Sequence, residues 1–77
     1  MSTDPVSTST TLTITVNGES RTIQLGATVI DLLQEIGLSS GRVAIERNLD
    51  ILPRSLWRET QVQSNDSFEI VHFVGGG

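Results

Sequence analysis

The stretch that decides the fold closes the chain: FEIVHFVGGG, residues 68–77. Residues 68–74 are mostly aromatic and β-branched, the side chains that favour a strand. Because this run is so strongly hydrophobic, it predicts a strand in the centre of a sheet. The glycines that follow lack a β-carbon and adopt conformations closed to other residues. The sequence therefore predicts a central strand that leads directly into a flexible glycine tail, Gly75–Gly77.

Side chains alternate between the two faces of a strand, so the last strand divides into two sets. Phe68 and Ile70 are expected to face a helix, and Val71 and Phe73 to face the opposite way. If Val71 and Phe73 are exposed, they form an apolar docking patch next to the tail. The alternative is that loops or the turn at residues 54–57 cover them.

The glycine tail itself has two interpretations. Three extended glycines reach about 10 Å, at roughly 3.5 Å per residue. A thread of that kind suits delivery of a terminal carboxylate into a narrow tunnel of another protein. The other interpretation is a disordered end or a scar of truncation.

A β-hairpin is predicted at the start of the domain. LTITV, residues 12–16, alternates apolar and polar side chains, as a strand with one buried face does. Asn17-Gly18 favours a type I′ turn, because both central residues of that turn need a positive φ. SRTIQL, residues 20–25, alternates again and predicts that Ile23 and Leu25 point inward.

The segment GATVIDLLQEIG, residues 26–37, predicts a helix of about nine residues. Thr28 is a good N-cap, and Asp31 three residues later completes a capping box. Gly37 is expected to be the left-handed residue that ends the helix. The apolar stripe at helical spacing consists of Val29, Leu32, Leu33 and Ile36.

The remaining segments predict shorter elements. RVAIE, residues 42–46, is a third strand with Val43 and Ile45 on one face, and residues 50–52 form a short strand that Pro53 ends. Residues 53–60 predict a 3₁₀-like turn, and residues 64–66 a tight turn before the last strand. The order predicts an α+β fold of the β-grasp, ubiquitin-like type, a mixed four- to five-stranded sheet with one main helix on one face.

Three parts are expected along the chain: a disordered leader at residues 1–11, a β-grasp domain at residues 12–74 and the tail at residues 75–77. The leader is rich in Ser and Thr and lacks the basic and apolar regions of a secretory signal. No apolar run approaches the roughly 20 residues that a membrane span needs, so no membrane partner is expected.

Composition narrows the classes of function. The 77 residues carry a formal net charge of −4, which argues against nucleic acid as a partner, since phosphate contacts need clustered cations. The chain has no cysteine, which fits a cytoplasmic protein and removes Cys ligands for zinc. All five basic residues are arginines: Arg21, Arg42, Arg47, Arg54 and Arg58.

Few side chains suggest chemistry of their own. His72 is the single histidine and is expected to be an ordinary strand residue, so no metal site is predicted. Asp4, Asp31 and Asp66 are expected to be solvated or to cap turns. No phosphate-binding glycine loop and no Ser-His-Asp triad can be argued. Trp57 is expected to lie as a lid over one end of the core, or to contact a partner.

Taken together, these segments resemble the sulfur carrier proteins of thiazole formation in thiamine biosynthesis, the ThiS family. The resemblance covers about Leu12 to Gly77, and its most specific parts are the Pro53-Arg54 pair with Trp57 and the C-terminal stretch. The segments that carry it are VNGE (16–19), TVIDLLQEIGL (28–38), VAIERN (43–48), ILPRSLW (51–57) and FEIVHFVGGG (68–77).

The resemblance implies a reaction cycle in which this chain is a cosubstrate and not an enzyme. A ubiquitin-activating-like (ThiF-like) adenylating enzyme would bind the domain and supply ATP and magnesium, so no cofactor is expected on this chain. The Gly77 carboxylate would become an acyl-adenylate, and a sulfur donor protein would convert it to a thiocarboxylate. Thiazole synthase (ThiG-like) would accept the sulfur. The implied site residues are Gly77 as the reactive group, Gly75 and Gly76 as the tail, and Val71, Phe73 and Arg54 for partner binding.

Other functions share the same features. The small subunit of molybdopterin synthase has the same fold, tail and activation chemistry, and neighbouring genes would separate the two pathways. A ubiquitin-type protein modifier would be found attached to cellular lysines. A binding module with an inert tail would keep its activity after removal of the last two glycines.

Overall fold

The structure is a computed structural model, and it describes residues 10–38 and 42–73. Most of the predicted leader, Val74 and the predicted tail lie outside the described residues. The elements are β1 (Thr11–Val16), β2 (Glu19–Gln24), α1 (Val29–Glu35), β3 (Arg42–Arg47), β4 (Asp50–Ile51), the 3₁₀ turn η2 (Arg54–Leu56) and β5 (Ser67–Phe73).

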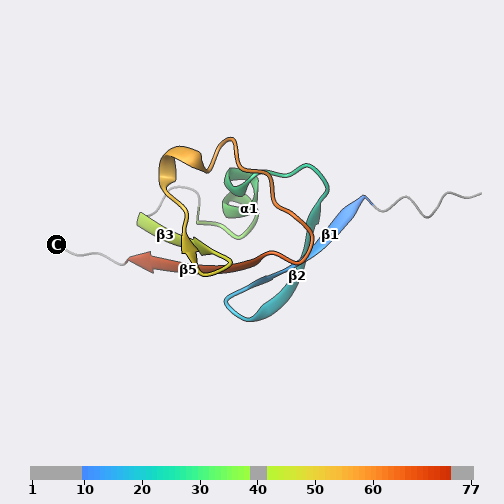
Figure 1. Cartoon of the computed structure of the whole chain (residues 1–77), viewed down its shortest axis with the longest axis horizontal. Helices are drawn as coiled ribbons and strands as arrows, with labels where there is room; N and C mark the ends of the chain where they lie inside the picture. The colour runs from blue at the N-terminus through green and yellow to red at the C-terminus, as the bar shows by residue number, and fades with distance from the viewer. Residues whose placement is uncertain (1–9, 39–41, 74–77) are drawn as a thin grey trace, which may run out of the picture.

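The described strands form one mixed sheet in the order β2-β1-β5-β3-β4. β5 pairs parallel with β1 and antiparallel with β3, so the last strand of the chain lies in the middle, as its hydrophobicity predicts. Helix α1 packs on one face of the sheet, and no helix in the described part of the chain covers the other face (Figure 1). The predicted β-grasp arrangement is confirmed, with five strands and one helix.

Two tight turns with positive φ connect the strand pairs. Asn17 and Gly18, with φ of 52° and 84°, join β1 to β2, and Val16 pairs directly with Glu19. Asn48 and Leu49, with φ of 53° and 75°, join β3 to β4 in the same way. The Asn-Gly hairpin prediction is thus confirmed, and the second turn places an asparagine in the equivalent first position.

Helix α1 has the predicted N-cap. The Thr28 hydroxyl accepts from the Asp31 N–H at 3.3 Å, and the Asp31 carboxylate accepts from the Thr28 N–H at 2.9 Å, which completes the capping box. At the other end Gly37 has a φ of 85°, and the Leu38 N–H donates to the Leu33 carbonyl at 2.8 Å. This is a Schellman motif, so the short helix is satisfied at both ends by its own sequence.

The core lies between α1 and the inner face of the sheet. The fully buried side chains are Ile14, Val29, Leu32, Leu33, Ile45 and Phe68. Trp57 lies over one end of this core, and its indole N–H donates to the Leu52 carbonyl at 2.9 Å. The prediction of Trp57 as a hydrophobic lid with a satisfied N–H is therefore confirmed.

One expectation about side-chain environment is wrong. Leu25 is 58% exposed, because β2 ends at Gln24 and the chain turns away at Gly26. Asp66 has the second of its two expected roles: it is buried, and it caps the turn before β5. Its carboxylate accepts from Arg47 Nε at 2.9 Å, from Asn48 Nδ2 at 3.1 Å and from the Gln63 N–H at 2.8 Å. A buried carboxylate is tolerated here because these donors replace water.

Candidate functional site

Strand β5 carries the candidate docking residues on the face away from α1. Phe68 and Ile70 point to the helix and are 0% and 6% exposed, whereas Val71 and Phe73 are 54% and 53% exposed. Nothing among the described loops covers Val71 and Phe73, so the alternative that they are hidden by the turn at residues 54–57 is wrong. Among the described residues, Val71 and Phe73 are the last apolar side chains that point outward, and Phe73 is two residues before Gly75.

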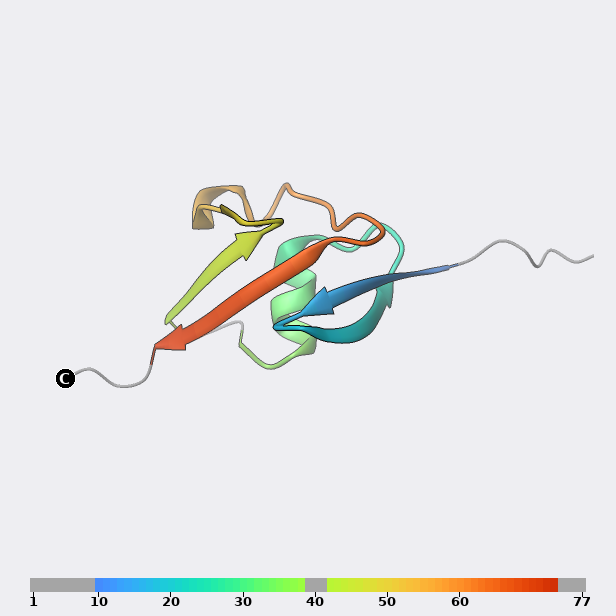
Figure 2. The ribbon, with the colours of Figure 1, turned by 60° about the horizontal axis from the view of Figure 1, so that its bottom comes forward.

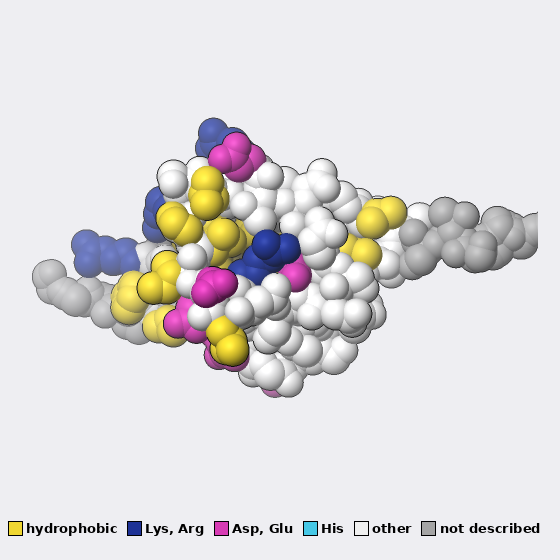
Figure 3. Space-filling view, in the orientation of Figure 1, with side chains coloured by type: hydrophobic (Ala, Val, Ile, Leu, Met, Phe, Trp, Pro, Cys, Tyr) yellow, Lys and Arg dark blue, Asp and Glu magenta, His cyan; other side chains and the backbone are white. Residues whose placement is uncertain are grey.

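Neighbouring strands enlarge this apolar surface. Ala44 of β3 pairs with Val71, and Ile51 of β4 pairs with Glu46 two residues further along β3. Ala44, Ile51 and Val71 line a shallow hollow of about 370 Å³. We call Ala44, Ile51, Val71 and Phe73 the outer patch. Figure 3 shows hydrophobic side chains gathered at the end of the described molecule where β5 ends.

Charged side chains border the outer patch. Arg42 is the register partner of Phe73, and Glu46 is the register partner of Glu69. The patch is therefore apolar in its middle, basic next to the end of β5 and acidic further back along the strand. An apolar centre with a charged rim is the usual anatomy of a protein-binding surface.

The other half of the outer face is different. β1 and β2 present mainly hydroxyl and amide side chains there, with Thr13 opposite Thr22 and Thr15 opposite Ser20 in the register. Exposed large apolar side chains lie on β4 and β5 and in the turns beside them, apart from Leu25. On the face opposite α1, β1 and β2 thus form a polar half, and the outer patch with its charged border lies on the other half, at the end of β5.

The three glycines follow this patch closely along the chain. Gly75, Gly76 and Gly77 are outside the described residues, as noted above, and β5 ends at Phe73. Gly77 is four residues beyond Phe73, a span of at most roughly 14 Å when extended. A partner that binds the outer patch would therefore meet Gly77 within that distance of Phe73.

Arg54 lies in a different surface feature. Its guanidinium stacks 4.8 Å from the centroid of the Trp57 ring, a cation–π geometry. Arg54, Arg58 and Ile30 line a hollow of about 350 Å³ that shares no residue with the hollow at the outer patch. The structure thus groups Val71 with Phe73 and places Arg54 apart from them.

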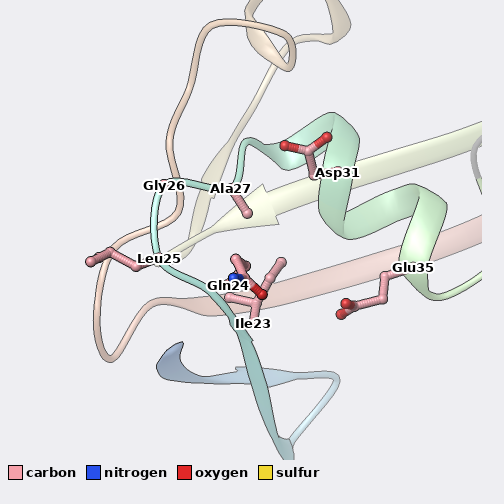
Figure 4. A pocket seen from close by; sticks show the side chains of 7 residues that line it. All are labelled: Ile23, Gln24, Leu25, Gly26, Ala27, Asp31 and Glu35. Atoms are coloured by element: carbon pink, nitrogen blue, oxygen red, sulfur yellow. The ribbon is translucent and has the colours of Figure 1, made fainter. Parts of the chain in front are cut away.

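A further hollow, of about 340 Å³, lies between β2 and α1 (Figure 4). Asp31 and Glu35 line it from the helix, while the Leu25 side chain extends away from α1. The hollow runs along α1 from the first turn to its last residue, and the Asp31 carboxylate is already engaged in the capping box.

Two kinds of feature are absent from the described residues, a metal-binding cluster and a membrane-spanning helix. Within residues 10–38 and 42–73, no group of three or more His, Cys, Asp or Glu side chains could hold a metal ion. His72 is exposed in β5. None of the helices that the structure describes is long and apolar enough to cross a membrane.

Sequence reasoning missed two members of the outer patch. The sequence patterns predict only that Ala44 lies in a strand and that Ile51 lies in a short strand before Pro53. Ala44 could have been found from alternation, because its neighbours Val43 and Ile45 form the buried set. Ile51 could not, because its face depends on the pairing of β4 with β3.

Comparison with known proteins gives consistent results. Residues 14–77 match the model of the ThiS family. A thiazole synthase of Paramagnetospirillum magneticum is 45% identical over 64 residues, which are 83% of this chain and 20% of that protein. The chain thus spans about a fifth of the length of that relative. Sulfur carrier protein ThiS of Bacillus subtilis is 42% identical over 50 residues, 65% of this chain and 76% of the relative.

A solved structure shares the fold. The crystal structure of the thiamine biosynthesis protein ThiS from Geobacter metallireducens superposes with a TM-score of 0.72 at 30% sequence identity. The superposition covers 86% of this chain and 100% of that one. The expected resemblance and the β-grasp fold are confirmed by these matches.

Proposed function

The chain belongs to the ThiS family, and from this we propose that it is a sulfur carrier in the thiazole branch of thiamine biosynthesis. The observation that carries the proposal is the extent of the family match, which runs from β1 through residue 77 and so includes the glycine tail. The exposed apolar surface directly before that tail supports it independently.

The proposed chemistry takes place at the Gly77 carboxylate. One carboxylate oxygen attacks the α-phosphorus of ATP, pyrophosphate leaves, and an acyl-adenylate forms. Hydrosulfide, HS⁻, released by a donor protein then attacks the acyl carbon, and AMP leaves with the electron pair of the broken C–O bond. Loss of the S–H proton gives a C-terminal thiocarboxylate. Adenylation is needed because a free carboxylate has no good leaving group.

The globular domain supplies recognition for this cycle. We assign docking of the adenylating enzyme to the outer patch, with Val71 and Phe73 nearest the tail, and give Arg54 a separate partner contact. Gly75 and Gly76 let the chain enter a narrow active site, since they carry no side chain. ATP and magnesium belong to the partner, and this chain acts as a cosubstrate in the cytoplasm.

Thiazole synthase is the proposed acceptor of the sulfur. The thiazole synthase of P. magneticum contains a segment similar to this chain, which supports a functional association between the two kinds of domain. The matches named for thiamine biosynthesis favour this pathway over molybdopterin synthesis.

Complementation tests the proposal. A bacterial thiamine auxotroph that lacks its own sulfur carrier should grow without thiamine when it expresses this chain. A matched variant without Gly76 and Gly77 should be produced at the same level and should not restore growth. Growth restored equally by both forms would point to an inert tail. Rescue of a molybdopterin carrier mutant instead would assign the alternative pathway.

A further inference from the structure

The turn residue Asn17 makes contacts that its role in the turn does not require. Its side-chain Oδ1 accepts from the main-chain N–H of Ile70 at 2.7 Å. Its Nδ2 donates to the carbonyl of the same residue at 3.1 Å. One carboxamide therefore pairs with both polar main-chain groups of one residue in β5, as a neighbouring peptide group of a strand would.

This contact lies at the point where β5 no longer has β1 as a neighbour. The parallel pairing of β1 with β5 ends at Val16 and Phe68, and the main-chain N–H of Asn17 donates to the Phe68 carbonyl at 2.8 Å. After Asn17 the chain turns into β2, while β5 continues past the end of β1 toward the C-terminus (Figure 2). The Asn17 side chain thus gives β5 one more pair of hydrogen bonds on the side where β1 has ended.

The pairing at Ile70 is needed on physical grounds. Ile70 is buried, and buried main-chain N–H and C=O groups are nearly always hydrogen-bonded. Beyond this residue the described part of β5 pairs only with β3. Two-stranded ribbons twist more than wider sheets, so the direction of a strand with one neighbour is less well fixed.

The position of Ile70 connects this contact to the reactive end. Ile70 lies seven residues before Gly77, at the base of the segment that carries Val71, Phe73 and the tail. A change in the direction of β5 at Ile70 therefore moves both the outer patch and the point from which the tail leaves.

We propose that Asn17 is a positioning residue that fixes the direction in which the C-terminal segment leaves the sheet and so the entry of the Gly77 carboxylate into the adenylating enzyme. This inference rests on the proposed function for its reaction and on the two hydrogen bonds to Ile70 for its geometry. Asn17 touches neither ATP nor the reacting carboxylate and acts through β5.

The chain supplies a control of the same residue type. Asn48 is also the first residue of a two-residue turn, has a φ of 53°, and accepts from the Ser67 N–H through Oδ1 at 2.9 Å. Its Nδ2 also donates to the buried Asp66 carboxylate at 3.1 Å, so Asn48→Gly also tests whether a loss of stability alone lowers kcat. Asn17→Gly and Asn48→Gly both keep a residue that tolerates positive φ and remove a carboxamide bonded to β5. Asn17→Gly removes the carboxamide at Ile70, near the tail, and Asn48→Gly removes the carboxamide at Ser67, at the start of β5.

Steady-state kinetics of carrier-dependent ATP–pyrophosphate exchange with the cognate adenylating enzyme separates positioning from stability. The measurement is made at a temperature where all variants are folded, as thermal melts establish. We expect Asn17→Gly to lower kcat about tenfold with KM within about twofold. A misdirected tail should reduce the fraction of bound complexes in which the carboxylate reaches ATP, while the affinity of docking changes little. For Asn48→Gly both constants should stay within about twofold of the wild type.

Asn17→Asp provides a partial rescue. It keeps an acceptor for the Ile70 N–H but loses the donor to the Ile70 carbonyl, so its kcat should lie between those of the wild type and Asn17→Gly. Equal kcat for Asn17→Gly and Asn48→Gly would overturn the proposal.

Amide hydrogen exchange gives a readout that needs no enzyme. Asn17→Gly should accelerate exchange at Ile70 at least tenfold and at Val71 and Phe73 severalfold, and Asn48→Gly should leave the last two unchanged. Unchanged exchange at Val71 and Phe73 in Asn17→Gly would overturn the proposal even if the wild type is adenylated. If the wild type is not adenylated while exchange changes as expected, the proposed function fails and the geometric role of Asn17 stands.

Discussion

The two faces of strand β5 carry similar side chains in opposite roles. Phe68 and Ile70 point to α1 and belong to the core, whereas Val71 and Phe73, a few residues further on, point outward and stay exposed. The strand therefore contributes to folding through one face, and through the other it exposes the apolar side chains to which we assign partner binding. Its hydrophobicity alone indicates a central strand, and only the alternation separates the two roles.

The difference between the faces has a simple physical origin. One seven-residue helix can cover one side of a five-stranded sheet, and the sequence supplies no second helix in the described part of the chain. Polar Thr and Ser side chains occupy the uncovered face on β1 and β2, so that half needs no cover. The apolar outer patch on β3, β4 and β5 is the exception, and exposed apolar patches of this kind are typical of interaction sites.

The largest expected effect compares two phenylalanines of the same strand. Phe68→Ala should lower the free energy of unfolding by about 3–5 kcal/mol, because it opens a cavity under α1. Phe73→Ala should lower it by less than about 1 kcal/mol, since the side chain is half exposed. Thermal and denaturant unfolding of both variants measure the difference. Equal losses would show that Phe73 belongs to the core and would break the comparison.

A second effect concerns the buried carboxylate at the start of β5. Asp66→Asn should lower the free energy of unfolding by about 1–3 kcal/mol. The new amide NH₂ is itself a donor, and it would face one of the groups that now donate a hydrogen bond to the Asp66 carboxylate. Those donors come from Arg47, Asn48 and Gln63. The matched variant Asp50→Asn changes an exposed carboxylate of β4 and should stay within about 0.5 kcal/mol of the wild type. A similar, small cost for both would mean that the Asp66 contacts contribute little.

Substitutions in the outer patch should lower the affinity for a partner and leave the free energy of unfolding almost unchanged. Phe73→Ala is expected to weaken binding of the cognate adenylating enzyme by about 1–3 kcal/mol, the range of a strong interface residue. Thr13→Ala changes an exposed side chain on the polar half of the same face and serves as the control, with no change in affinity. Isothermal titration calorimetry of the folded variants measures their affinity for the adenylating enzyme. If Phe73→Ala binds with normal affinity, Phe73 does not belong to the docking site.

The smallest expected effect tests the corrected position of Leu25. Leu25→Ala should change the unfolding free energy by less than about 0.5 kcal/mol, because the side chain is exposed after the end of β2. Leu33→Ala, at a buried position of α1, should cost about 2–5 kcal/mol. A large loss of unfolding free energy in Leu25→Ala would indicate that β2 includes Leu25 and that its side chain points into the core, as the alternation of residues 20–25 predicts.

The elements that the sequence predicts correctly depend on local chemistry. Asn17-Gly18 specifies a hairpin turn, Thr28 and Asp31 begin the helix, and Gly37 ends it. In each case the residues that interact lie within a few positions of one another. The central place of β5 also follows from its own composition.

The features that could not be predicted depend on distant partners. Asp66 is buried because Arg47 and Asn48, 19 and 18 residues earlier, lie beside it. The exposure of Leu25 depends on where β2 stops, and alternation does not encode the end of a strand. The carboxamide of Asn17 reaches Ile70 across 53 positions of sequence, so its second role becomes visible only in the fold.

The central claim, that the domain serves a reactive C-terminal carboxylate, is tested most directly by locating sulfur on Gly77. The chain is incubated with a cognate adenylating enzyme, ATP, magnesium and a sulfur donor, and then cleaved with trypsin. Because Arg58 is the last basic residue, cleavage releases residues 59–77, a fragment without Met or Cys whose mass change is not confused with Met1 oxidation. The account predicts that this fragment gains the mass difference between sulfur and oxygen, only with ATP, and that removal of Gly76 and Gly77 abolishes the gain. An unmodified fragment in the presence of an adenylating enzyme shown to be active and cognate would contradict it.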